Sequence, residues 1–127
     1  RMAAGVPLAI ASGALGAEIR RVLDRTRLTP CFQTIVSAED TPAGKPAPDP
    51  YLRAVALLSA HLNEPLAARD CVAIEDSRWG LESARAAGLR TVGVTHTYEA
   101  AALASADLVI PSLDRLDLTR LERLCTD

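Results

Sequence analysis

Three small groups of polar residues in this sequence could act together in chemistry. Two adjacent carboxylates, Glu75 and Asp76, directly follow the apolar segment 71–74. Two carboxylates at the end of a buried strand repel each other and lose solvation, so their ionised forms need a cationic partner or a metal ion. Mg²⁺ suits such a pair, because it takes one or two carboxylates together with waters and substrate phosphate. The alternative is structural: Asp76 or Ser77 caps the next helix, and Glu75 is exposed.

Lys45 is the second group and the single lysine of the chain, which otherwise uses arginine for positive charge. Pro46 and Pro48 stiffen the loop that follows it. A lysine ammonium is a compact point charge with three donors, which suits a phosphate oxygen. Lys45 is therefore a candidate phosphate-binding residue, and the alternative is an ordinary solvated surface lysine.

Ser12 and Gly13 form the third group, directly after the apolar segment 8–11. A hydroxyl and free backbone N–H groups ahead of a helix can bind an anion, although Ser12 could simply cap that helix. Ser12, Lys45 and Glu75 follow one another at intervals of about 30 residues, close to one strand–helix unit. Because ligands bind outside the carboxyl ends of parallel strands, we expect the three groups at one edge of a sheet.

Strand and helix patterns alternate along the chain and supply the elements that must position these groups. Apolar runs predict strands at 8–11, 34–36, 71–74, 91–94 and 108–110, and apolar periodicity predicts helices at 15–23, 49–62, 78–87 and 116–124. Asp49 is expected to be the N-cap of its helix, with Pro50 at the first helical position. The alternation predicts an α/β fold, a Rossmann-like parallel sheet with helices on both faces, in a single domain over residues 1–127.

Composition excludes several classes of partner. The net charge is −2 and only 3% of the residues are aromatic, so neither phosphate-backbone nor base-stacking contacts with nucleic acid are expected. No apolar run approaches the roughly 18 residues of a membrane span, so no membrane contact is expected. Cys31, Cys71 and Cys125 lack the spacing of a zinc site or disulfide framework. They favour a reducing, cytoplasmic location.

Three segments of the chain, LAIASG, GKPAPDPY and EDSRWGLESARAAGL, resemble the second, third and fourth motifs of the haloacid dehalogenase superfamily. The resemblance is closest to its β-phosphoglucomutase and phosphoglycolate phosphatase-like branch. It implies a Rossmann-like core and Mg²⁺-dependent phosphoryl transfer through an aspartyl-phosphate, on a small phosphorylated metabolite. By position, Ser12 and the Gly13 N–H would bind the phosphoryl group. Lys45 would bridge that group and the nucleophile, while Glu75 and Asp76 would hold Mg²⁺ and favour phosphate monoesters over carbon–halogen bonds.

The sequence departs from this family in one respect. The first motif, DxDx[TV], which supplies the nucleophile, does not occur, and the cap domain is absent as well. The chain therefore resembles the C-terminal part of such a core, and residues 1–5 resemble the end of a helix closed by Gly5. The missing strand would lie between the strand ending at Ser12 and the strand ending at Glu75. We expect a complete core to need an N-terminal segment or a second copy, and the chain alone to be inactive.

Two other functions remain open at this point. The first is a non-catalytic domain that binds a phosphorylated ligand or a partner and has truly lost the first motif. The second is a dinucleotide-binding Rossmann domain, which is disfavoured because the segment SGALG does not supply the GxGxxG fingerprint.

Overall fold

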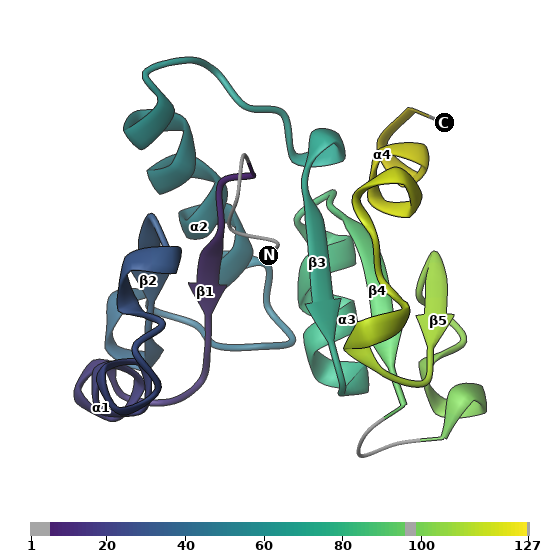
Figure 1. The fold of residues 1–127 in the computed structure, drawn as a ribbon, viewed down its shortest axis with the longest axis horizontal. Coiled ribbons are helices and arrows are strands. Elements are labelled where there is room, and N and C mark those ends of the chain that lie inside the picture. The colour runs from purple at the N-terminus through teal and green to yellow at the C-terminus, as the bar shows by residue number, and fades with distance from the viewer. Residues whose placement is uncertain (1–5, 96–98, 127) are drawn as a thin grey trace.

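Five parallel strands form two separate sheets in the computed structural model, which describes residues 6–95 and 99–126 (Figure 1). The first sheet pairs β1 (Ala9–Ala11) with β2 (Thr34–Val36). The second has the order β3-β4-β5 and consists of β3 (Val72–Glu75), β4 (Arg90–Val94) and β5 (Leu108–Ile110). The predicted strands are confirmed, each to within one residue at either end. The five residues compared above with a helix end lie outside the described residues.

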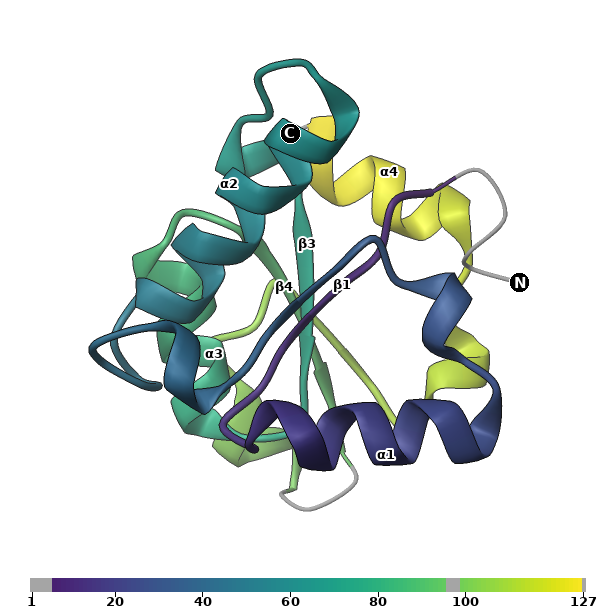
Figure 2. The same cartoon turned by 90° about the vertical axis from the view of Figure 1, so that its left-hand side faces the viewer.

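Four α-helices connect or flank these strands within the described residues. They are α1 (Gly16–Thr26), α2 (Asp49–Leu62), α3 (Arg78–Ala86) and α4 (Leu118–Thr126). Short 3₁₀ turns are η1 (Thr29–Cys31), η2 (Ala38–Asp40), η3 (Ala68–Asp70), η4 (Ala100–Leu103) and η5 (Leu113–Arg115). Figure 2 shows α2 and α3 on one side of the strands and α4 on the other. The α/β fold class, with helices on both faces of parallel strands, is confirmed.

The helix boundaries show where local sequence prediction was imprecise. Pro48, not Asp49, is the N-cap of α2, so Asp49 is the first helical residue and its side chain makes no capping hydrogen bond. Ser77 does cap α3, because its Oγ accepts a hydrogen bond from the Gly80 N–H at 3.1 Å. Gly88, just beyond α3, has a φ of 91°, which glycine adopts without the strain of a side chain.

The two sheets are joined by side chains and not by backbone pairing. β1 and β3 belong to different sheets, so the single sheet predicted above is divided between them. A hydrophobic cluster under α2 and α3 spans the division, since it includes Ala11 of β1, Tyr51 of α2 and Ala73 of β3. A second cluster lies on the opposite face, where Val92 and Ile110 are packed with residues of the α4 segment. α2 therefore holds the carboxyl ends of β1 and β3 near each other.

Among the described residues, no helix is long and apolar enough to cross a membrane.

Candidate active site

Lys45 connects the carboxyl ends of the two sheets. Its Nζ donates to the Oε2 of Glu75 at 2.5 Å and to the backbone carbonyl of Ala11 at 3.0 Å. Ala11 is the last residue of β1, and Glu75 is the last residue of β3. The Lys45 side chain is only 19% exposed, so it is not a solvated surface lysine. The structure thus brings Lys45, Glu75 and the residue next to Ser12 together, as the spacing predicted.

Glu75 is buried, with 8% of its surface exposed. A strand points alternate side chains to opposite faces, so Glu75 shares the covered face of Ala73 under α2 and α3. Its carboxylate reaches Lys45 on one side and the first turn of α3 on the other, where a Cβ on Gly80 would lie 1.9 Å from Oε1. The structural alternative was therefore half correct: Ser77 caps the helix, but Glu75 is not exposed.

Tyr51 is a member of the site that the sequence did not reveal. Its hydroxyl donates a hydrogen bond to Glu75 Oε2, and Lys45 Nζ lies 5.3 Å from the centre of its ring. Burial, and then the negative charge of Glu75, raises the pKa of the Tyr51 phenol well above its usual value. Helical periodicity over residues 49–62 places Tyr51 on the apolar face of the helix, with no other role indicated by that pattern. The only signal of another role was a hydroxyl on an otherwise apolar helix face.

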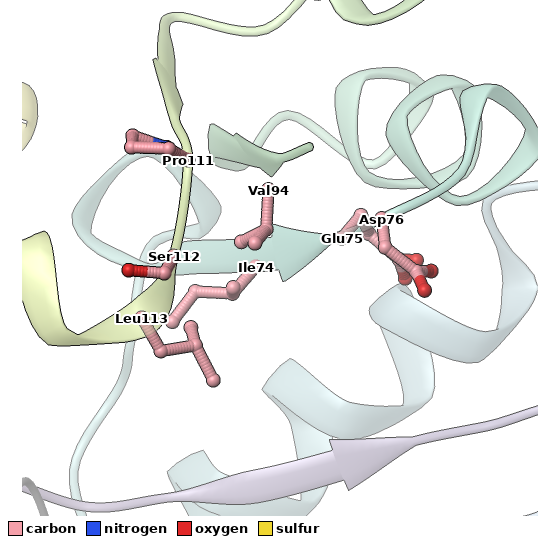
Figure 3. A pocket seen from close by; sticks show the side chains of 7 residues that line it. All are labelled: Ile74, Glu75, Asp76, Val94, Pro111, Ser112 and Leu113. Carbon is pink, nitrogen blue, oxygen red and sulfur yellow. The ribbon is translucent and has the colours of Figure 1, made fainter. Parts of the chain in front are cut away.

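Asp76 is exposed at the end of β3, next to the buried Glu75. Glu75 and Asp76 are among the residues that line a pocket whose remaining wall is mostly apolar (Figure 3). The other lining residues are Ile74, Val94, Pro111, Ser112 and Leu113. Among the residues that the structure describes, no group of three His, Cys, Asp or Glu side chains could hold a metal ion. Two adjacent carboxylates still match what a protein chain commonly offers Mg²⁺, because waters and substrate supply the other ligands.

Ser12 lies in the turn after β1 and does not cap α1, because Leu15 is the N-cap of that helix. Its Oγ accepts a hydrogen bond from the Ala14 N–H at 3.0 Å, and its own N–H donates to Val36 of β2 at 2.9 Å. Gly13 is exposed, and a Cβ placed on it would meet nothing within 4 Å. This turn is therefore open to solvent beside the carbonyl of Ala11 that binds Lys45.

The loop that carries Lys45 is anchored by a hydroxyl that sequence reasoning missed. The Ser83 side chain on α3 is fully buried and donates to the Ala47 carbonyl at 2.6 Å. Asp49, predicted above to be the N-cap of the helix after this loop, does not fill that role, so that prediction is wrong. Because Ser83 belongs to the same helix that packs on Glu75, both partners of the ion pair depend on α3.

Several known proteins are similar to this chain. The model of the haloacid dehalogenase-like hydrolase family matches residues 1–88. Hexitol phosphatase A of Escherichia coli is 34% identical over 92% of this chain and 51% of its own length. Beta-phosphoglucomutase of Bacillus subtilis is 33% identical over 80% of this chain and 41% of its own length. The crystal structure of CbbY from Rhodobacter sphaeroides in complex with phosphate has a TM-score of 0.79 at 28% identity, covering 93% of this chain and 52% of that one.

The matched share of this chain is larger than the matched share of its relatives. Almost all of this chain is matched, but it spans only about half the length of the curated relatives it matches.

Proposed function

This chain belongs to the haloacid dehalogenase-like hydrolases, and on that premise we propose that it is the phosphate- and metal-binding part of a Mg²⁺-dependent phosphatase or phosphomutase. Its substrate would be a small phosphate monoester, as the names of its phosphatase and phosphoglucomutase relatives suggest. The observation that carries the proposal is the contact of Lys45 with both Glu75 and the carbonyl of Ala11. That contact holds a cation where two strands end.

Lys45 would bind the phosphoryl oxygens at this position. The positive charge is held by an ion pair at 2.5 Å and sits in a largely buried environment, where its effect on developing charge is stronger than in water. The Ser12 hydroxyl and the Gly13 N–H, in the turn just beyond Ala11, would add hydrogen bonds to the same group.

Asp76 and Glu75 are the residues that would hold Mg²⁺. The exposed Asp76 carboxylate would be the principal ligand, and Glu75, whose Oε2 accepts hydrogen bonds from Lys45 and Tyr51, would complete the pair. When bound, the metal ion supplies positive charge that offsets charge on the phosphoryl oxygens.

The attacking carboxylate would come from a strand that this chain does not contain. We place that strand between β1 and β3, whose facing edges belong to different sheets. It would be provided by an N-terminal segment or by a second copy. Attack of its aspartate on phosphorus would form an aspartyl-phosphate and release the alkoxide of the substrate, and the phosphoryl group would then pass to water or to a second hydroxyl. The three free cysteines favour a reducing, cytoplasmic location for this protein.

Hydrolysis of p-nitrophenyl phosphate by the full-length protein tests the proposal. We expect turnover that requires Mg²⁺, and we expect Asp76→Asn to abolish it while the circular dichroism spectrum stays unchanged. Asp24→Asn makes the same exchange of carboxylate for carboxamide at an exposed position of α1, so it is the matched control and should retain activity. Wild-type turnover in the Asp76→Asn protein would show that the metal assignment is wrong. Phosphate binding without any turnover by the full-length protein would instead favour the non-catalytic domain.

A further inference from the structure

Tyr51 carries a hydroxyl in a position where packing alone would be satisfied by phenylalanine. The ring is 7% exposed and belongs to the hydrophobic cluster that includes Ala11 and Ala73. Burying a hydroxyl is unfavourable unless it finds a hydrogen-bond partner. Here its partner is the Oε2 of Glu75, so the hydroxyl is explained by that carboxylate and not by the core.

The Tyr51 side chain touches both members of the ion pair. Its hydroxyl donates to the same Glu75 oxygen that accepts from Lys45, and its ring lies beneath the Lys45 ammonium, 5.3 Å from centroid to Nζ. On the far side, the backbone of Gly80 occupies the space next to Oε1. The carboxylate is thus confined from three directions, by Lys45, by Tyr51 and by the backbone of Gly80.

We propose that Tyr51 is a positioning residue. Its hydroxyl holds the Glu75 carboxylate and its ring contacts the Lys45 ammonium, so that the ammonium stays at the ends of β1 and β3. This inference rests on the proposed function, in which Lys45 binds the transferring phosphoryl group. Tyr51 does not touch the substrate. Its hydroxyl acts through Glu75, and its ring acts directly on the lysine through a cation–π contact.

Removing the hydroxyl separates these effects. Tyr51→Phe keeps the ring, and therefore the packing and the cation–π contact, but leaves Glu75 Oε2 with Lys45 as its remaining partner among the hydrogen bonds described above. The carboxylate then gains freedom to rotate, and Lys45 follows it. We expect kcat to fall by roughly tenfold while KM changes by less than about twofold, because a displaced catalytic charge weakens transition-state stabilisation more than substrate binding.

A matched control distinguishes positioning from a general loss of stability. Thr91 on β4 is buried like Tyr51, and its hydroxyl donates to Asp107 Oδ2 at 3.2 Å and accepts from the Asp107 N–H at 3.0 Å. Thr91→Val therefore also removes a buried, hydrogen-bonded hydroxyl, but one that contacts neither Lys45 nor Glu75. Tyr51→Phe and Thr91→Val are both prepared in the full-length protein. Their kcat and KM are measured with p-nitrophenyl phosphate and Mg²⁺ at a temperature where both variants remain folded.

A second measurement does not depend on catalysis. Lys45 is acetylated with limiting acetic anhydride in the presence of EDTA, and its modification is quantified in the tryptic peptide 28–53, in which the Lys45–Pro46 bond resists trypsin. We expect acetylation of Lys45 to be severalfold faster in Tyr51→Phe than in the wild type, and unchanged in Thr91→Val.

The outcomes separate this inference from the proposed function. An unchanged acetylation rate in Tyr51→Phe, or a loss of kcat no larger than in Thr91→Val, would overturn the positioning role. A wild-type protein that neither hydrolyses a phosphate monoester nor transfers its phosphoryl group would refute the proposed function instead, and the acetylation rates would still decide whether Tyr51 holds Lys45.

Discussion

At the scale of single residues, the site depends on a lysine in a chain whose other strong cations are all arginines. Lys45 donates to a carboxylate and to a backbone carbonyl at the same time, and a small ammonium can point its N–H donors at both. A planar guanidinium is larger and presents its donors in a fixed fork. The type of cation therefore matters here as much as its charge.

Lys45→Arg is accordingly expected not to preserve activity. With a side chain that is only 19% exposed, the larger head group has to move away from Glu75 or displace Tyr51. We expect kcat/KM for p-nitrophenyl phosphate to fall by roughly 100-fold, as for a misplaced catalytic group. Arg21→Lys, the reverse exchange at an exposed position of α1, is the control and should be neutral. Near-normal activity of Lys45→Arg would mean that Lys45 does not contact the phosphoryl group.

At the scale of elements, the site exists because α3 approaches the end of β3 more closely than a helix with a side chain at residue 80 could. Gly80 is buried in the first turn of α3, directly against the carboxylate of Glu75. The same turn is closed by the Ser77 cap. The position of Glu75 is thus determined by a strand end and a helix start that are only a few residues apart.

Gly80→Ala tests this close approach. A Cβ would lie 1.9 Å from Glu75 Oε1, so either the carboxylate or the helix must shift. We expect the free energy of unfolding, measured by urea denaturation, to fall by about 1–3 kcal/mol, as for other overpacking substitutions. Gly44→Ala is the matched control, because a Cβ there meets nothing within 4 Å, and it should leave stability nearly unchanged. Equal stability of the two variants would contradict the close packing of α3 on Glu75.

The sequence predicted the elements well and the contacts between them incompletely. Apolar runs located all five described strands, and the order of polar groups correctly placed Lys45 near Glu75. Tyr51 escaped prediction because helical periodicity identifies a buried face without saying which partner a buried hydroxyl will meet. The burial of Glu75 could have been read from strand alternation with Ala73, whereas its contact with Gly80 depends on how two elements pack.

At the scale of the whole molecule, two sheets are held together by α2 and the cluster beneath it, and β1 and β3 present facing edges that do not pair with each other. Unpaired strand edges expose backbone donors and acceptors that readily pair with other chains. Ile74 of β3 is 42% exposed, which adds apolar surface near this edge.

The isolated 127-residue chain is therefore expected to associate. Light scattering should give a mass above that of the 13.5 kDa monomer at micromolar concentration. Addition of a separately expressed segment that carries the proposed strand should return the chain to a defined complex. A stable 13.5 kDa monomer whose β3 amides are all protected from exchange would show that no strand belongs between β1 and β3.

The placement of β3 between two hydrophobic clusters has a consequence for how the molecule opens. Val72 packs in the cluster on the α4 side, and its neighbour Ala73 packs in the cluster under α2 and α3. Each cluster with its helices can act as a separate cooperative unit, and such units exchange with locally unfolded states at different free energies. Opening of either unit alone leaves β3 held by the other. Glu75, at the end of this shared strand, should thus retain its surroundings through partial unfolding events that release α4.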